Sequence, residues 1–168
     1  MNNLFLTLGY DKFDPKVANN LATLVSLLVG LVILIELDAQ TLFLAAALIS
    51  IIAIKSINKY HENSDIEQPK NIVINKLIGM WFALSIAPSI SVSSDALLVL
   101  SNGFLIQAIF SLMFFVFFSL TKFSIIGRIE REAKGGLSVI GGDIIAGFAA
   151  GISSALTWQA WLNIQGML

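Results

Sequence analysis

The sequence of 168 residues contains no cysteine and a single histidine, His61. It therefore has no disulfide framework, no thiolate nucleophile and no cysteine ligands, and one imidazole cannot form a multi-histidine metal site. Charged residues are also scarce, at 12% of the chain, against about 25% in a typical soluble domain. Ten basic and eleven acidic residues leave a net charge of −1, so the chain has no excess positive charge with which to bind nucleic acid.

Hydrophobic residues make up 57% of the chain, and its mean hydropathy is +0.85. This composition predicts an integral membrane protein with a single domain over residues 1–168. A membrane-spanning helix needs roughly 20 mostly apolar residues. We expect an all-α membrane protein, a compact bundle of about five transmembrane helices at residues 20–37, 41–57, 72–92, 96–120 and 142–162.

The distribution of basic residues predicts the orientation of this bundle. They lie before the first predicted span, between the second and third, and between the fourth and fifth. The loops at residues 38–40 and 93–95 and the C-terminal end have none. Because lysine and arginine are enriched in cytoplasmic loops, we expect a cytoplasmic N-terminus. The apolar start at residues 1–8 lacks a basic n-region and no cleavage site follows it, so this start, with Tyr10 and Phe13, suits the membrane interface better than a signal peptide.

Polar residues inside the third predicted span are functional candidates, because polar groups are costly in a membrane. Asn75 and Lys76 lie one turn into this apolar stretch. Snorkelling to the cytoplasmic surface is an equally weighted alternative for Lys76. A spacing of four predicts one small, partly polar helix face suited to close packing: Asn71, Asn75, Gly79, Ala83 and Ala87.

The fifth predicted span contains Asp143 on the same face as Gly147 and Gly151, which form a GxxxG spacing. Such spacing is typical of a helix-packing seam. The carboxylate of Asp143 is therefore expected to point into the bundle, where it needs a cation or several hydrogen bonds.

The cytoplasmic ends of the last three predicted spans bring polar residues to one place in the expected bundle. These residues are Asn75, Lys76, Ser119, Lys122, Arg131 and Asp143. A glycine-rich turn that opens a helix can bind an anion through its free N–H groups. Gly135 and Gly136, together with Lys122 and Arg131, are therefore expected to bind a phosphate at headgroup depth. The mixed-charge residues 130–134 are expected to form a solvated loop.

Two of these segments resemble the phosphatidylglycerophosphatase A family of bacterial membrane phosphatases. Residues 72–81, IVINKLIGMW, are similar to the family's I-V-x-D-E-x-x-G-M-W. Residues 115–147 align without gaps with F-R-x-x-D-x-x-K-P-x-P, then D-R, G-G and D-D-I-x-A-G. This second block keeps Phe115, Lys122, Arg131, Gly135, Gly136, Asp143, Ile144, Ala146 and Gly147, with Glu130 in place of an aspartate.

The resemblance implies a magnesium-dependent enzyme that removes the terminal phosphate from phosphatidylglycerophosphate to give phosphatidylglycerol. It also implies the inner membrane of a bacterium, with the polar site on the cytoplasmic face. The acidic residues of the family are the natural holders of the ion, because Mg²⁺ binds through carboxylates, waters and substrate phosphate.

Most of these acidic positions are replaced in this sequence. The Asp-Glu pair reads Asn75-Lys76, the aspartate of the next motif is Ser119, and the Asp-Asp pair reads Gly142-Asp143. The family's N-terminal P-G-T-x-G-S reads PKVANN at residues 15–20. We therefore expect no bound metal and treat Asp143 and Lys122 as vestigial catalytic residues. Lys76 is expected to pair with Asp143 and to supply the positive charge that the ion supplies in the family.

Three functions remain open from the sequence, and whether the chain is an enzyme is open with them. The first is a family member with lost or reduced catalysis, acting as a lipid-binding protein or as a subunit of a membrane complex. Its partners would be a membrane phospholipid and a protein partner or a second copy. The second is an active lipid phosphatase with a rearranged site, which a magnesium ion at Asp143 would favour. The third is an unrelated small accessory subunit.

Overall fold

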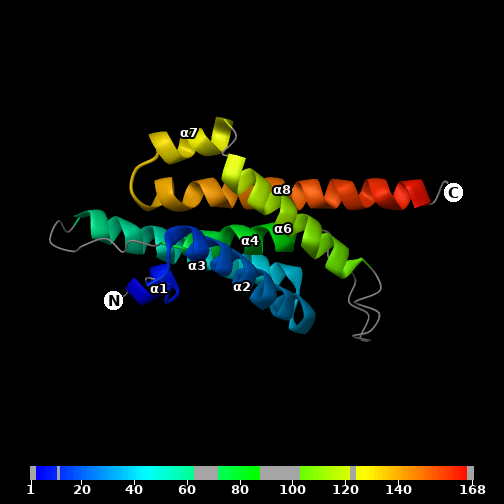
Figure 1. Ribbon diagram of the computed structural model, residues 1–168, viewed down its shortest axis with the longest axis horizontal. Coiled ribbons are helices and arrows are strands. Elements are labelled where there is room, and N and C mark those ends of the chain that lie inside the picture. Colours follow the sequence, from blue (N-terminus) through cyan, green and yellow to red (C-terminus); the bar gives the residue numbers. More distant parts are fainter. Residues whose placement is uncertain (1–2, 11, 63–71, 88–102, 122–123, 166–168) are drawn as a thin grey trace.

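The computed structural model describes residues 3–10, 12–62, 72–87, 103–121 and 124–165, and these contain helices without strands (Figure 1). The helices are α1 (Asn3–Thr7), α2 (Pro15–Glu36), α3 (Ala39–Glu62), α4 (Ile74–Ile86), α6 (Phe104–Thr121), α7 (Ser124–Glu132) and α8 (Gly136–Gln165). Helices α2, α3, α6 and α8 are long and apolar enough to cross a membrane, and α4 is a shorter apolar helix. The prediction of an all-α membrane protein is confirmed.

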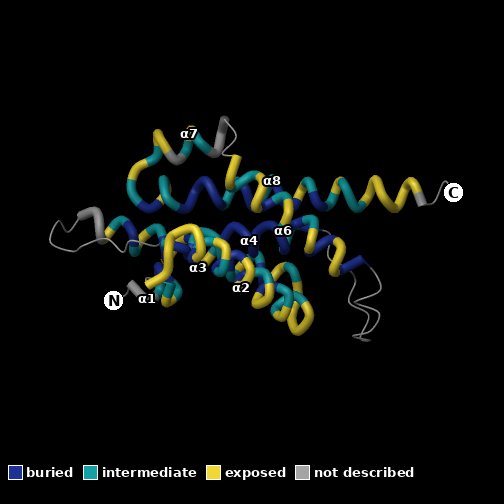
Figure 2. The backbone as a smooth tube through the Cα atoms, viewed as in Figure 1, coloured by how far each residue is buried: buried dark blue, intermediate teal, exposed yellow. Residues whose placement is uncertain are grey.

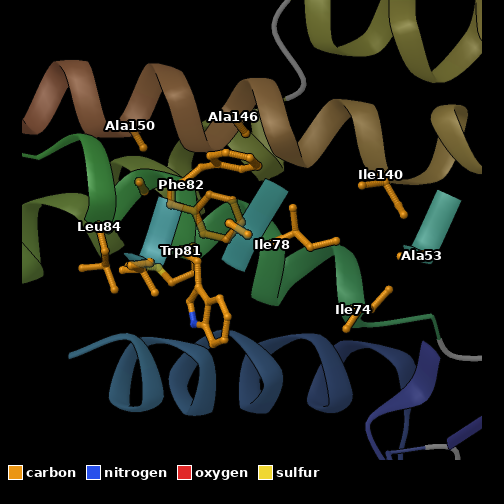
Figure 3. Close-up of a cluster of buried hydrophobic side chains, with 14 of the residues drawn as sticks. Ala53, Ile74, Ile78, Trp81, Phe82, Leu84, Ile140, Ala146 and Ala150 are labelled. Atoms are coloured by element: carbon orange, nitrogen blue, oxygen red, sulfur yellow. The ribbon is translucent and has the colours of Figure 1, made fainter. Parts of the chain in front are cut away.

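Helix α4 lies among the other helices and contacts α2, α3, α6 and α8 (Figure 1). Its run from Ile78 to Leu84 is buried without interruption, as is typical of a helix that is apolar on all sides. Trp81 points toward α2 (Figure 3) and donates its indole N–H to the carbonyl oxygen of Ser26 at 3.0 Å. The polar atom of this buried side chain is therefore satisfied.

Helices α4 and α8 approach closely along the small residues that the sequence predicts for this purpose. A Cβ atom added to Gly147 would overlap the carbonyl oxygen of Gly79. A Cβ atom added to Gly151 would lie 2.9 Å from the carbonyl oxygen of Ala83. The predicted packing seam is confirmed, and it places the start of α4 directly beside the first half of α8.

The outward faces of α2, α3 and α6 carry large apolar side chains. Leu28 on α2, Leu44 on α3 and Met113 on α6 are all more than half exposed, and much of the backbone of α2 is coloured as exposed in Figure 2. Such surfaces suit contact with lipid tails.

Helix α3 is capped by Asp38, which follows α2. The Thr41 N–H donates to the Asp38 carboxylate, and this hydrogen bond lowers the pKa of the Asp38 carboxyl.

Two predicted elements differ from the structure after residue 121. Residues 130–132 of the mixed-charge segment belong to helix α7 rather than to a loop, and Arg131 and Glu132 are exposed as expected, whereas residues 133 and 134 follow the helix. An ion pair of 2.9 Å between Arg128 and Glu132 supports this helix, and Ile129 packs against Gly141 of α8. Helix α8 also begins at Gly136, six residues before the predicted start.

The beginnings of the chain and of α4 add two further differences. Leu6 and Thr7 are fully buried, and the Leu6 carbonyl accepts the Val73 N–H at 3.0 Å. Helix α1 therefore packs against the N-terminal end of α4, whereas the sequence predicted a segment at the membrane interface. Helix α4 ends at Ile86, two residues before Pro88. The remainder of the third predicted span and the first part of the fourth, residues 88–102, lie outside the described residues.

Candidate functional site

A pocket of about 520 Å³ lies where the first halves of α2 and α4 meet the second half of α6 and the first half of α8. Helix α2 lines it with polar side chains that precede its apolar run. The other three helices contribute Asn75, Lys76, Ser119 and Asp143. The convergence of these four residues confirms the predicted meeting of the helix ends.

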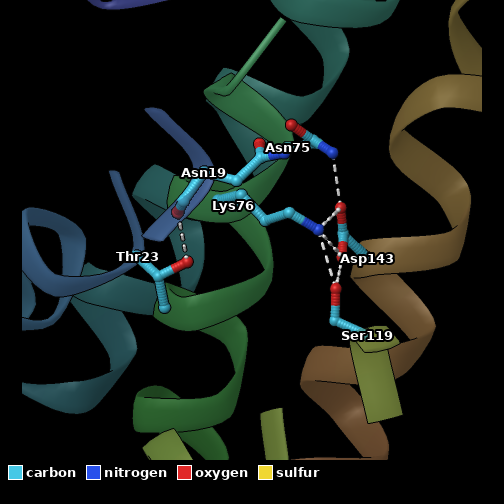
Figure 4. Close-up of polar contacts among 6 residues, drawn as sticks. All are labelled: Asn19, Thr23, Asn75, Lys76, Ser119 and Asp143. Carbon is cyan, nitrogen blue, oxygen red and sulfur yellow. Dashed lines mark hydrogen bonds and ion pairs between the residues drawn. The ribbon is translucent and has the colours of Figure 1, made fainter. Parts of the chain in front are cut away.

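Asp143 is the centre of a hydrogen-bonded network in this pocket (Figure 4). The Lys76 ammonium lies 2.9 Å from both carboxylate oxygens. The Ser119 hydroxyl donates to Oδ1 at 2.7 Å, and the Asn75 amide donates to Oδ2. The side chains of Lys76 and Asp143 are only 17% and 7% exposed. The predicted ion pair is therefore confirmed, and Lys76 does not snorkel away from it.

The donors of Lys76 are all committed within this network. An ammonium group has three N–H donors. Those of Lys76 reach the two oxygens of Asp143 and, at 2.7 Å, the Ser119 hydroxyl. Each oxygen of Asp143 accepts two hydrogen bonds. The Asn75 Oδ1 atom is buried without a hydrogen-bond partner among the described residues.

The donor set of the pocket is a poor match for Mg²⁺, the ion that the sequence resemblance implies. Mg²⁺ requires near-octahedral oxygen ligands and is usually held by one or two carboxylates. Asp143 is the one carboxylate among the described residues that line the pocket, and a lysine contacts both of its oxygens. Across the described parts of the chain, no group of three or more histidine, cysteine, aspartate or glutamate side chains could hold a metal.

Among the described residues, Arg131, Gly135 and Gly136 do not line this pocket. Arg131 is exposed on α7. Gly135 adopts a φ of +64°, which forms the turn into α8, and the Gly136 N–H donates to Asn58 on α3 at 2.6 Å. These glycines therefore hold α8 against α3 in the structure. Lys122 lies outside the described residues, so its expected phosphate contact and that of Arg131 stay predictions.

Helix α2 contributes pocket residues that the site prediction omitted: Lys16, Asn19, Asn20 and Thr23. Spacings of three and four place these residues on one helix face. The available signal was the replacement of P-G-T-x-G-S by PKVANN, which adds a lysine and two asparagines at the start of an apolar helix. Thr23 donates its hydroxyl proton to the Asn19 carbonyl at 2.8 Å.

Comparison with protein families agrees with the two sequence blocks. The model of the family described as phosphatidylglycerophosphatase A matches residues 3–158, nearly the whole chain. The chain therefore belongs to this family. No curated protein and no solved structure matches it.

Proposed function

We propose that this chain is a metal-independent, phospholipid-binding member of the phosphatidylglycerophosphatase A family, with phosphatase activity lost or much reduced. One observation carries the proposal: the Lys76 ammonium contacts both carboxylate oxygens of Asp143. In the family pattern, the positions of Lys76 and its neighbours Asn75 and Ser119 are acidic. A cation built into the chain thus stands where the family's carboxylates would gather around an ion.

The replacement of acidic residues by Asn75, Lys76 and Ser119 removes the carboxylates that would hold the divalent ion used in phosphoryl transfer. Enzymes of this chemistry work mainly by positioning and by neutralising charge, and divalent ions supply much of the neutralisation. Lys76 supplies one positive charge, which Asp143 already balances. Asn75 and Ser119 are neutral donors to the same carboxylate. Asp143 therefore serves as a structural anchor rather than as a metal ligand or nucleophile.

The walls of the pocket support a lipid as the retained ligand. Its polar residues lie beside Phe115, Val116 and Leu120 of α6. Leu120 is 76% exposed, and Val116 is 38% exposed. An amphiphile can place its headgroup among the polar side chains and its tails along this apolar edge. The protein acts in a bacterial inner membrane with the pocket on the cytoplasmic face, alone or beside a protein partner.

A phosphate-release assay on the purified protein tests this function. The substrate is phosphatidylglycerophosphate in mixed micelles, with Mg²⁺ or with a chelator. We expect the unmodified protein to release no more phosphate than its Asp143→Asn variant under either condition. Mg²⁺-dependent turnover that Asp143→Asn abolishes would overturn the proposal and would identify an active lipid phosphatase with a rearranged site.

A further inference from the structure

Two lysines line the pocket: the ammonium group of Lys76 is fully hydrogen-bonded, whereas that of Lys16 forms no ion pair among the described residues. The three N–H donors of Lys76 are all used by Asp143 and Ser119. A ligand phosphate could bond to Lys76 only if one of these hydrogen bonds broke. Because the pair is mostly buried, that exchange would leave part of the Asp143 carboxylate without its counter-charge. Lys76 is therefore poorly suited to hold an anionic ligand.

Lys16 lines the same pocket from α2, and its side chain is exposed. Within the described part of the chain, its ammonium forms no ion pair; the nearby Asp14 accepts the Lys16 backbone N–H at 2.9 Å and caps the helix. One turn further along, Asn19 and Asn20 line the pocket as well. Each carboxamide carries two N–H donors and one acceptor, so this wall offers one free charge flanked by neutral donors.

The charge of the pocket indicates the kind of phosphate that it accommodates. Lys76 and Asp143 neutralise each other, so the described residues that line the pocket carry one net positive charge, that of Lys16. A phosphodiester carries one negative charge, whereas a phosphomonoester carries about −1.5 to −2 near neutral pH. In a partly desolvated site the unmatched charge of the monoester is unfavourable. The balance therefore favours a diester.

From this geometry we infer that Lys16, with Asn19 and Asn20, forms the headgroup-binding site and selects a singly charged phosphodiester lipid. The inference rests on the proposed lipid-binding function and names its ligand class. The apolar edge formed by Val116 and Leu120 faces the same pocket, so the phosphate belongs to a lipid rather than to a soluble ester. The charge available to an anion therefore lies on α2 rather than at the Asp143 centre.

Native mass spectrometry of the purified protein in detergent, with lipids added in equal amounts, tests this inference. We expect one bound phosphatidylglycerol, a singly charged diester, in preference to zwitterionic phosphatidylcholine. Lys16→Gln should weaken phosphatidylglycerol binding about tenfold, as expected for the loss of one charge-assisted hydrogen bond. Lys16→Arg should retain the binding. Lys12→Gln is the matched control, because Lys12 is an exposed lysine near α2 that does not line the pocket.

Two further ligands separate the parts of the inference. Phosphatidic acid, a monoester, should bind more weakly than phosphatidylglycerol, and the soluble diester glycerophosphoglycerol should not displace the lipid. Equal binding by Lys16→Gln and the unmodified protein would overturn the role of Lys16, and tighter binding of phosphatidic acid would overturn the diester selectivity. Both results concern lipid binding alone. A failure of the proposed function would instead appear as Mg²⁺-dependent turnover in the phosphate-release assay, so the two failures are distinguishable.

Discussion

The Lys76 ammonium on α4 and the Asp143 carboxylate on α8 are joined by two contacts of 2.9 Å. This pair lies at the end of the seam where Gly79 and Gly147 bring the two backbones together. A cluster of carboxylates at this crossing would repel unless a cation bridged it. In this chain a lysine forms an ion pair with Asp143 at the crossing, and the proposed metal-independent function predicts several properties of the protein.

Breaking either side of the pair should destabilise the protein. Lys76→Met or Asp143→Leu should each lower the free energy of unfolding by about 3–5 kcal/mol, because the remaining charge is left buried without a partner. The double variant should recover most of that loss. Reversible unfolding of the purified protein in micelles measures the cycle.

A second cycle on Arg128 and Glu132 provides the control. This pair has the same 2.9 Å contact, but its side chains are 71% and 64% exposed. Substituting both with glutamine should reveal a coupling of only about 0.3–0.5 kcal/mol. Strictly additive losses at Lys76 and Asp143 would contradict a buried, mutually dependent pair.

The α4–α8 seam should tolerate no added methyl group. Gly147→Ala should destabilise the fold by about 1–3 kcal/mol through overpacking against Gly79, although alanine is the better helix former by about 1 kcal/mol. Ala160→Val on the exposed end of the same helix is the control, with an expected change within about 0.5 kcal/mol. A Gly147→Ala variant more stable than the unmodified protein would contradict the close approach.

Restoring the acidic set should make stability depend on the metal. The combined substitutions Asn75→Asp, Lys76→Glu, Ser119→Asp and Gly142→Asp place carboxylates around Asp143. Without metal the variant should melt at a lower temperature than the unmodified protein, and millimolar Mg²⁺ should raise its Tm by mass action. Some Mg²⁺-dependent phosphate release should return. A Tm that Mg²⁺ leaves unchanged would contradict the assignment of these positions to an ion site.

The positive-inside pattern predicts that the two termini lie on opposite sides of the membrane. A phosphatase reporter that is active only outside the cytoplasm, fused after Leu168, should therefore be active. The same reporter fused within residues 63–70, a hydrophilic segment between the second and third predicted spans, should be inactive. Activity at the loop and silence at the C-terminus would invert the orientation and place the pocket on the outer face.

The pairing at the centre of the site was predictable from the sequence because an unpaired charged side chain inside a membrane is energetically unfavourable. Asp143 shares a seam with Gly147, which directs it into the bundle, and Lys76 is the nearest basic residue at a matching depth. The same reasoning placed Asn75 and Ser119 beside them. These inferences need only helix periodicity and the expense of isolated charge in a membrane.

Features that depend on contacts between distant segments were not predictable in this way. The anion site suggested by the glycines at 135 and 136 stays a prediction, whereas the hydrogen bond from the Gly136 N–H to Asn58, 78 residues earlier in the chain, was not foreseen. Helix α7 has a charge-rich sequence, and its packing on Gly141 is visible only in three dimensions. Lys16 joins the pocket because α2 packs against α4, a pairing that no local pattern specifies.

The claim that Lys76 takes the place of a metal ion is tested most directly by calorimetric titration of Mg²⁺ into the unmodified, metal-free protein. We predict no saturable binding at millimolar Mg²⁺, because Asp143, the sole carboxylate in the described lining of the pocket, is already held by Lys76, Asn75 and Ser119. Saturable Mg²⁺ binding that disappears in the Asp143→Asn variant would contradict the account.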